Sequence, residues 1–474
     1  MKIVVCGAGV GGLAAAARLA AAGHGVTILE QGAAPGGKAG RLERDGFRFD
    51  TGPSLLTMPQ VLRELLAATG PDEEDGLDLV RVEPVTRYRF ADGSTLELSA
   101  DLPRALEALA AWSPGADADW AAFLGTCAAM WRASVPFLAG PPPWPPRRPA
   151  PGAPSPDPRD LVRVRPWRTL SGLARAHARD PRLRMVIERF ATYAGADPRR
   201  APAALAVAGY VEHAFGAWHV RGGLHAVVEA LARRVCERGG TLRTGARVVG
   251  VDRTGGRVRG IVLAGGERVP ADAVVWNGDA LTLDRLLGRA VGRAPARSLS
   301  GLALLLGLRG SEPGRVHHEI RFPADYGAEF DDVFGARRVP RDPALYLSTS
   351  CVTDPGEAPP GDENLFVLVN VPAGADDAAL GALEERVIDR LGVRGRIAVQ
   401  ARRGPADLER ETGAVGGAIY GAAPHGRLAP IRRPGPEVRG VRGLLRVGGT
   451  VHPGGGLPLV MLGAKTVADL VGPP

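Results

Sequence analysis

A glycine-rich turn lies between an apolar strand and a helix at the start of the chain. The turn reads Gly7-Ala8-Gly9-Val10-Gly11-Gly12, after a strand at residues 2–5 and before an alanine-rich helix over residues 13–22. Gly7 permits the tight turn, Gly9 lets a phosphate lie against the backbone at the helix N-terminus, and Gly12 permits close packing of helix on strand. This order of elements predicts a βαβ unit that binds the pyrophosphate of a dinucleotide.

The second strand, residues 25–29, ends in an acidic residue, Glu30. A carboxylate at that position accepts hydrogen bonds from the hydroxyls of an adenosine ribose and repels a phosphate, which argues against NADP. The alternative is a secretory signal peptide with Lys2 as its charged end. A second strand closed by an acid has no place in a signal peptide, and the segment is too short and too interrupted by glycine to span a membrane.

The last part of the chain repeats the order of strand, glycine loop and helix. The loop reads Gly448-Gly449-Thr450-Val451-His452-Pro453-Gly454-Gly455-Gly456 and leads into a helix that begins near Leu457 and Pro458. Backbone without side chains lets a flat ligand approach closely, and helix N–H groups point at its electron-rich edge. Together with the N-terminal turn, this loop predicts the floor of a flavin site.

Two short motifs after Glu30 make a family resemblance specific. They are Gly36-Gly37-Lys38 and Asp50-Thr51-Gly52-Pro53. The chain resembles the flavin-dependent amine oxidase and phytoene desaturase superfamily, in which a GG-[RK] turn and a D-x-GP segment follow the ribose-binding acid. The resemblance implies an FAD site that includes Gly37, Lys38, Gly52, Pro53 and Val248. In this comparison the GG-[RK] turn lies along the pyrophosphate and ribityl chain, and the backbone of Val248 lies on the adenine.

Later motifs resemble the carotenoid desaturase branch of that superfamily. The segments are 317–320, 329–335, 362–369 and the C-terminal glycine loop. The resemblance implies that Gly448 and Gly449 lie near the phosphate–ribityl side of FAD, and that the helix at Leu457-Pro458 faces the flavin ring. No cysteine follows Cys351, so we expect the FAD to be held non-covalently.

These patterns predict an α/β protein with a discontinuous Rossmann-like FAD-binding domain, a mixed-sheet substrate domain and a helical cap. The expected divisions are 1–70, 216–297 and 430–474 for the FAD-binding domain, 298–429 for the substrate sheet, and 71–215 for a helical, membrane-facing cap. A proline-rich stretch at 136–158 contains Trp144 and Arg147 and fits either an interfacial flap that touches lipid headgroups or a plain linker.

The resemblance implies hydride abstraction from an allylic carbon of an acyclic carotenoid by oxidised flavin, followed by proton loss. Such chemistry mainly requires position and exclusion of water, and no catalytic base is assigned. Residues 416–426 resemble the branch that desaturates the 3,4 bond of 1-hydroxylated carotenoids. A carotenoid ketolase or isomerase is a further alternative. A non-enzymatic isoprenoid carrier like the Rab GDP-dissociation inhibitors is the alternative from another class, and Glu30, Lys38 and the glycine loop favour a bound flavin over it.

The charge, the histidines and the cysteines indicate which binding partners and which cell compartment to expect. The net charge of +8 and pI near 9.8 fit an anionic membrane surface better than nucleic acid, because the basic residues are scattered and match no nucleic-acid-binding motif. His317 and His318 are neighbours in an expected strand and point to opposite faces, so we expect no metal site. The four cysteines form no CxxC pair, which favours a reduced, cytoplasmic protein at the membrane periphery. Oxygen or a membrane quinone is the expected electron acceptor, since no second nucleotide fingerprint is present.

Overall fold

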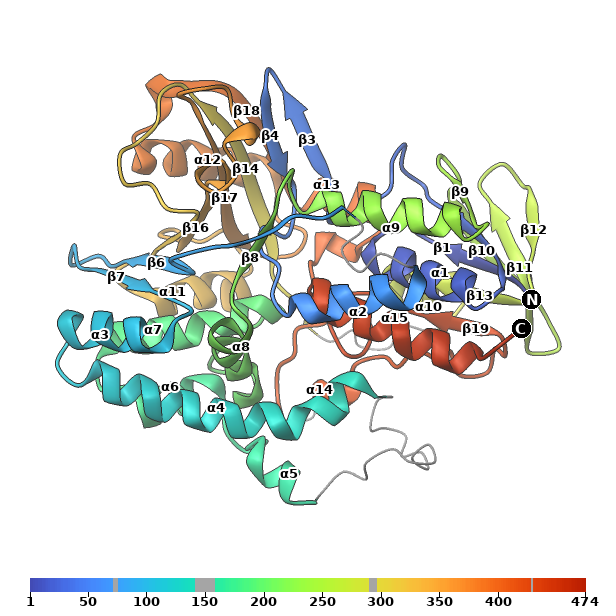
Figure 1. Ribbon diagram of the computed structural model, residues 1–474, viewed down its shortest axis with the longest axis horizontal. Coiled ribbons are helices and arrows are strands. Elements are labelled where there is room, and N and C mark those ends of the chain that lie inside the picture. The colour runs from blue at the N-terminus through green and yellow to red at the C-terminus, as the bar shows by residue number, and fades with distance from the viewer. Residues whose placement is uncertain (71–75, 141–157, 290–295, 428) are drawn as a thin grey trace.

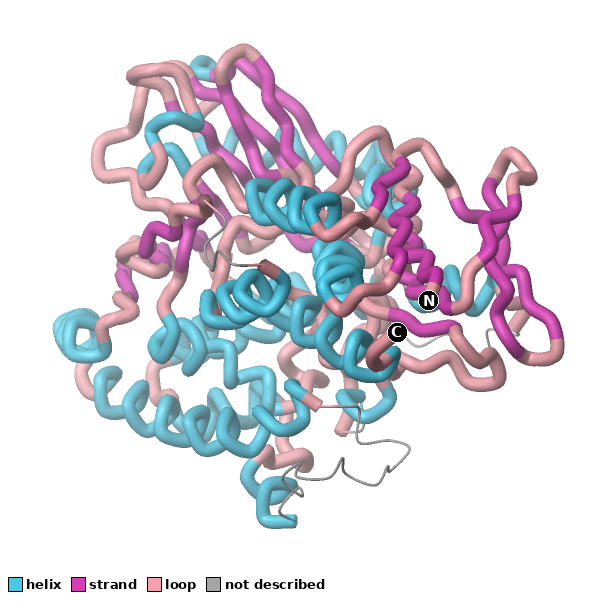
Figure 2. The backbone as a smooth tube through the Cα atoms, turned by 45° about the vertical axis from the view of Figure 1, so that its right-hand side comes forward, coloured by secondary structure: helices cyan, strands magenta, loops and turns pink. Residues whose placement is uncertain are grey.

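The computed structural model describes residues 1–70, 76–140, 158–289, 296–427 and 429–474. Most of the proline-rich stretch predicted at 136–158, including Trp144 and Arg147, lies outside the described residues. The strands fall into two separate groups, one at the top and one at the right of the view in Figure 2, and helices lie between and below them. The termini meet at the right-hand end in Figure 1. The predicted α/β class is confirmed.

A five-stranded parallel sheet forms the centre of the first unit. Its order is β19 (Leu444–Arg446), β13 (Ala273–Trp276), β1 (Lys2–Cys6), β2 (Gly25–Leu29) and β9 (Thr241–Arg243). Every neighbouring pair is parallel, and the last residues of the central strands are in register: Cys6 is paired with Trp276 and with Leu29, and Trp276 with Arg446. The carboxyl ends of strands from three distant parts of the chain therefore meet at one edge.

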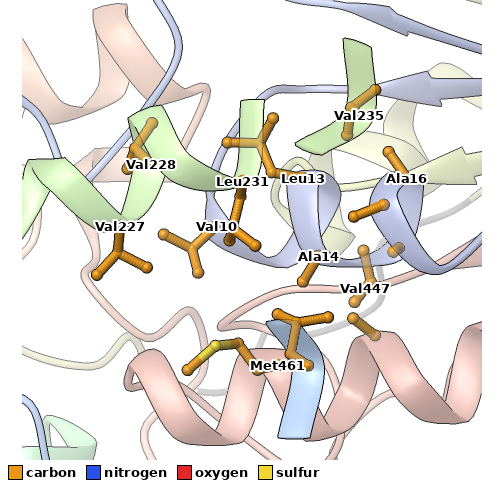
Figure 3. Packing of buried hydrophobic residues seen from close by; sticks show 14 of the residues in the cluster. Val10, Leu13, Ala14, Ala16, Val227, Val228, Leu231, Val235, Val447 and Met461 are labelled. Carbon is orange, nitrogen blue, oxygen red and sulfur yellow. The ribbon is translucent and has the colours of Figure 1, made fainter. Parts of the chain in front are cut away.

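Helices cover one face of this sheet and a small antiparallel sheet covers the other. The helices are α1 (Val10–Ala21), α2 (Pro59–Thr69), α9 (His225–Glu237) and α15 (Leu457–Val471), whose apolar side chains interdigitate around Val10, Leu231 and Met461 (Figure 3). The opposite face packs on β10 (Val248–Thr254), β11 (Arg257–Leu263), β12 (Arg268–Pro270) and α10 (Ala280–Leu286). The alternation of strand side chains explains both layers, because Ile3 and Val5 contact the helices and Val4 and Cys6 the small sheet.

A seven-stranded mixed sheet forms the second unit. Its order is β18 (Ile397–Arg403), β14 (Ser300–Leu308), β17 (Glu363–Val371), β16 (Leu345–Ser348), β15 (His318–Arg321), β6 (Thr86–Arg89) and β7 (Thr95–Leu98). All pairs are antiparallel except β15 with β6. Helix α12 (Asp377–Leu391) packs on one face, and the hairpin β3 (Arg41–Arg44) and β4 (Phe47–Asp50) brings Phe47 and Phe49 to the other.

Helices form a layer below this sheet (Figure 1). They are α3 (Leu102–Trp112), α4 (Ala116–Ala139), α5 (Pro158–Arg163), α6 (Leu170–His177), α7 (Pro181–Glu188), η1 (Arg189–Ala194), η2 (Ala203–Ala206) and α8 (Val207–Phe215). Apart from α5, which contacts α4, they contribute apolar residues to one cluster with β6, β7 and β15. The division of the chain at 71–215 stays a prediction, but it does not separate helices from sheet, because β6 and β7 lie within it and extend the seven-stranded sheet.

Helix α4 is, within the described ranges, the one helix long and apolar enough to cross a membrane by length and composition alone. Core helices of soluble proteins pass the same test, and the first half of α4 packs in the helical layer through Trp120, Phe123 and Cys127. Its second half is mostly exposed or half-buried, with Val135 at 39%.

The remaining elements are short connections. They are β5 (Leu79–Arg81) paired with β8 (Trp218–Val220), α11 (Tyr326–Phe330), η3 (Asp331–Ala336), η4 (Ser350–Val352), η5 (Pro355–Glu357), η6 (Arg394–Arg396), α13 (Pro405–Thr412), η7 (Val415–Gly417) and α14 (Ala429–Arg432).

Candidate functional site

The N-terminal turn lies at the carboxyl edge of the parallel sheet, at the start of α1. A Cβ atom at Gly12 would collide with the carbonyl oxygen of Gly7, so only glycine permits this approach of helix to strand. The first turn of α1 is buried at Val10, Gly11 and Gly12. Within the described residues its N-cap, Gly9, provides no side-chain acceptor, and the first turn holds no acidic residue. Buried N–H groups at an uncapped helix start require an acceptor, and a phosphate is the acceptor that such a start binds.

Glu30 directly follows β2 beside this turn and is 6% exposed. Its Oε2 accepts a hydrogen bond from the backbone N–H of Ala8 (2.7 Å), and its Oε1 accepts one from Gly32 (2.8 Å). These bonds fix the carboxylate, and each oxygen retains a second lone pair that can accept a ribose hydroxyl. The backbone carbonyl of Glu30 also accepts from the Ala246 N–H (2.7 Å), which brings the strand that begins at Val248 close to Glu30, and the adenine contact that the resemblance implies for Val248 stays a prediction.

The Gly36-Gly37-Lys38 turn lies against both the first turn and the D-x-GP segment. The Gly36 N–H donates to the Ala8 carbonyl (2.9 Å). A Cβ atom at Gly52 would collide with the carbonyl of Lys38, which explains the glycine of the D-x-GP motif, and Pro53 follows it. Four predicted residues, Gly37, Lys38, Gly52 and Pro53, are thus brought into one place.

The Lys38 side chain points to a segment of the second unit. Its ammonium donates to the carbonyls of Ala418 (3.4 Å) and Ile419, and desolvation lowers its pKa to about 8, with Asp279 acting in the opposite direction. The role beside the pyrophosphate that the resemblance implies for Lys38 stays a prediction.

Asp50, the acid of the D-x-GP motif, caps a helix. Its carboxylate accepts from the N–H groups of Leu224 (2.7 Å) and His225 (3.1 Å) at the start of α9. Burial raises the pKa of Asp50 to about 6, these two bonds lower it, and the nearby Glu357 raises it further. The motif therefore ties the segment next to the glycine turns to a helix more than a hundred residues later.

The C-terminal glycine loop completes the site from the opposite side. Gly448 approaches Gly11: a Cβ atom on Gly11 would lie 3.3 Å from the Gly448 Cα. Gly449 follows, and its carbonyl accepts from Arg433 (2.9 Å). Helix α15 begins at Leu457 and Pro458, both buried; the structure gives it no capping side chain in the described part and no acid in its first turn. The start of α15 is therefore a second uncapped helix start, and its position against the flavin ring stays a prediction.

Sequence reasoning missed Asn277, which lies directly after β13. Its Nδ2 donates to the carbonyls of Gly7 (3.3 Å) and Gly9 (3.4 Å). Cβ atoms added to Gly11 or to Gly448 would each lie 2.9 Å from its Oδ1. A polar residue immediately after a buried strand was the available signal, because that position falls at the same sheet edge as the N-terminal turn.

Sequence reasoning also missed Tyr420 and Arg433 at the glycine loop. The ring of Tyr420 lies against Gly455, and burial raises its pKa to about 12. Burial lowers the pKa of Arg433, which forms no ion pair within the described residues. A half-buried guanidinium without a carboxylate partner suits a ligand that carries negative charge or carbonyl oxygens.

The residues present fit FAD. Two uncapped helix starts, glycine backbone without side chains, the fixed Glu30 carboxylate and the half-buried Arg433 supply the groups that such a cofactor needs. The donors match a pyrophosphate and an electron-rich ring edge, and the acceptors match a ribose.

A separate buried cluster joins His219, Asp354 and Glu357, whose ligand-type atoms lie within 4.8 Å of one another. His219 Nε2 is 3.5 Å from Glu357 Oε1, and the Asp354 Oδ2 accepts from the Gly222 N–H (2.7 Å). The sequence prediction of no metal considered only the run at His317 and did not foresee this cluster. The cluster is a buried contact between an imidazole and a carboxylate, beside the Asp354 carboxylate that fixes the loop at Gly222.

A family model described as flavin containing amine oxidoreductase matches residues 10–390. The hydroxyneurosporene desaturase of Rubrivivax gelatinosus is 36% identical over 495 residues, covering 99% of this chain and 92% of the relative. The zeta-carotene-forming phytoene desaturase of Myxococcus xanthus is 34% identical over 489 residues, covering 99% and 93%. The crystal structure of an oxidoreductase from Methanosarcina mazei has a TM-score of 0.64 at 19% identity, covering 99% of this chain and all of that one, a likeness of fold.

Proposed function

The chain belongs to the flavin-containing amine oxidoreductase family and to its carotenoid desaturases, and from this membership we propose that it is an FAD-dependent desaturase that introduces C=C bonds into an acyclic carotenoid. The observation that carries the proposal is the match to two carotenoid desaturases over 99% of the chain. The chain is an enzyme rather than an isoprenoid carrier.

We infer that the flavin is FAD and that it is held non-covalently. Glu30 and the uncapped start of α1 support an adenosine and a pyrophosphate in addition to the flavin itself. Non-covalent binding is supported by the sequence, in which the last cysteine is Cys351 and the C-terminal loop contains none.

Bound flavin supplies the acceptor for a hydride from an allylic carbon. The chain's own residues hold the cofactor and exclude water. Phe47, Phe49 and Phe366 pack in a buried apolar cluster next to the D-x-GP segment and keep this part of the molecule dry. A hydrocarbon that is held in a fixed position away from water needs no strong base for the reaction, which fits the lack of an assigned base.

The second candidate is a 1-hydroxycarotenoid 3,4-desaturase. The hydroxyneurosporene desaturase relative favours it, as does the segment at Gly416–Gly421. In this structure that segment provides the carbonyls that accept from Lys38 and the Tyr420 ring at the glycine loop, so it belongs to the flavin side of the substrate space.

We further propose that the enzyme acts in the cytoplasm, bound peripherally to a membrane that supplies its substrate, and that oxygen or a membrane quinone reoxidises the flavin. A hollow between α4 and α5 supports the membrane part, because apolar and basic side chains alternate around it. Its lining consists of Thr126, Ala129, Val162, Arg163, Arg165, Trp167 and Arg168. Val162 is 60% and Trp167 50% exposed, a combination that suits a lipid interface.

Expression in two hosts tests the function. One host accumulates phytoene and the other 1-hydroxyneurosporene, and pigment spectra are recorded with and without the gene. We expect a longer polyene in at least one host, and conversion confined to the second host would establish the second candidate. Unchanged spectra in both hosts, with the protein expressed and carrying flavin, would refute the desaturase assignment.

A further inference from the structure

A buried polar network lies inside the otherwise apolar helical layer. Arg189, 4% exposed, donates through Nη1 to the Tyr193 hydroxyl (2.7 Å) and through Nη2 to the Tyr88 hydroxyl (2.9 Å). Tyr193 donates to Glu212 Oε1 (2.8 Å), which is also 3.6 Å from Arg189 Nη2. Three elements contribute, namely β6, η1 and α8, and α8 stands between the sheet and α4 in Figure 1.

Burying the charged groups of this network costs free energy of folding, which suggests that the network serves a function. An ion pair removed from water loses hydration that its own attraction repays only in part. Here the guanidinium also lies near the rings of Tyr88 (5.4 Å), Phe190 (5.2 Å) and Tyr193 (4.8 Å), and apolar residues of the same cluster surround it. A substrate space built only for a hydrocarbon has no need of these charges.

Two hydrogen-bonding positions of the network remain open. Arg189 Nε is buried and has no partner among the described residues. Both contacts of Glu212 involve Oε1, which leaves Oε2 to accept another hydrogen. The network therefore offers one donor and one acceptor, and a hydroxyl group is the simplest group that uses both.

Tyr193 is the member of the network that a ligand can reach. It is 36% exposed, whereas Arg189, Glu212 and Tyr88 are all under 8% exposed. Burial nevertheless raises the pKa of Tyr193 well above its usual range. Tyr193 therefore joins the buried members of the network to a part of the molecule that a ligand can reach.

The segment that carries Tyr193 adjoins the C-terminal glycine loop. Gly195 follows Tyr193 by two residues, and a Cβ atom there would lie 2.8 Å from the Tyr420 ring. Tyr420 in turn lies against Gly455, next to the start of α15. The network is thus connected through two contacts to the loop predicted to face the flavin ring.

We propose that Glu212, Tyr193 and Arg189 recognise a hydroxyl group at the end of the carotenoid next to the oxidised bond. The inference rests on the proposed function and deepens it, because it names a hydroxylated acyclic carotenoid as the preferred substrate class. The three residues act on specificity and take no part in the chemistry. A hydrocarbon end leaves Arg189 Nε and Glu212 Oε2 without a partner, and a methyl ether can accept from Arg189 but cannot donate to Glu212.

The test compares three substrates that share one polyene: neurosporene, 1-hydroxyneurosporene and the methyl ether of the latter, each delivered in phosphatidylcholine liposomes. We expect the unaltered enzyme to favour the hydroxylated substrate over both others in kcat/KM. Glu212→Gln and Tyr193→Phe should each reduce that preference roughly 10- to 100-fold, the range of one hydrogen bond to a charged group, while conversion of neurosporene changes little.

Tyr326→Phe is the matched control, since Tyr326 lies buried in the same cluster, outside the network. It should leave the preference unchanged. Flavin absorbance per protein confirms folding, and Tyr193→Phe keeps the ion pair, so it remains informative where Glu212→Gln does not fold. An unaltered preference in the folded variants, or an equal loss for all three substrates, would overturn the inference. Conversion of all three without preference overturns it and leaves the desaturase proposal standing, whereas conversion of none refutes the desaturase proposal itself.

Discussion

Asn277 shows how one side chain can hold a cofactor site together. It follows β13, and its amide bonds to two carbonyls of the N-terminal turn while its Oδ1 faces Gly11 and Gly448. Glu30 could be predicted because its role depends on spacing within one βαβ unit. Asn277 could not be ranked, because only the parallel register of β1, β13 and β19 brings it to that turn.

Asn277→Asp should weaken FAD binding tenfold or more. The substitution keeps the shape but replaces the NH2 donor with a carboxylate oxygen that faces the carbonyls of Gly7 and Gly9. Loss of these two bonds costs about 1–3 kcal/mol, and the added negative charge repels the pyrophosphate expected there. Titration of the flavin-depleted protein with FAD, followed by flavin fluorescence, measures the effect.

Asn364→Asp is the control for this change. Asn364 lies on β17 of the seven-stranded sheet and is buried, and its Nδ2 donates to the carbonyl of Arg48 (2.7 Å) on β4. We expect it to lower the temperature of unfolding while the folded protein binds FAD with unchanged affinity. Equal FAD affinities of the two variants would contradict the role given to Asn277.

At the scale of elements, the sequence could predict how some helices begin but not how others do. The starts of α1 and α15 were predictable, because glycine before an apolar run marks an uncapped start beside a ligand. The cap of α9 was not, since the capping carboxylate belongs to Asp50 at the end of β4. A cap supplied by another element leaves no local pattern in the sequence.

Asp50→Asn should remove a pH dependence of stability. The pKa of Asp50 is about 6 in the folded protein against 3.8 for the free side chain, so the folded state holds this proton more tightly. The group therefore disfavours folding increasingly as pH rises from about 4 to 6, by up to roughly 3 kcal/mol. Relative to Asp50→Asn, the unaltered protein should lose stability across this window.

Urea unfolding followed by tryptophan fluorescence between pH 4 and 7 measures this difference. Asp376→Asn serves as the control, because Asp376 caps α12 through the Ala379 N–H at an exposed position. The free energy of unfolding of Asp376→Asn should differ from that of the unaltered protein by an amount that changes little between pH 5 and 7. If the free energies of unfolding of Asp50→Asn and the unaltered protein differed by the same amount at every pH from 4 to 7, the raised pKa of Asp50 would be contradicted.

At the scale of the molecule, the chain crosses between its two units several times. The sequence located the parallel sheet, since each of its strands is followed by a motif or a helix of recognisable pattern. It did not reveal that β6 pairs with β15, more than two hundred residues later, because a four-residue strand does not specify its partner. Because of this pairing, the mixed sheet and the helical layer share one hydrophobic core, which includes Tyr88, Phe322 and Phe190.

Helices α4 and α5, with residues 164–168 after α5, lie on a side of the molecule away from the parallel sheet (Figure 1). We expect this surface to bind phosphatidylcholine–phosphatidylglycerol vesicles, and Val162→Ser with Trp167→Ser to weaken binding roughly tenfold or more, since each large apolar side chain contributes about 1.5–3 kcal/mol on burial. Added salt should also weaken vesicle binding, because it screens the attraction of Arg165 and Arg168 to the anionic lipid.

The double variant Val352→Ser with Val249→Ser is the control. It removes apolar groups that are 47% and 43% exposed on other elements, and vesicle co-sedimentation should not change. Equal losses for the two double variants would assign membrane binding to general surface hydrophobicity instead of this surface.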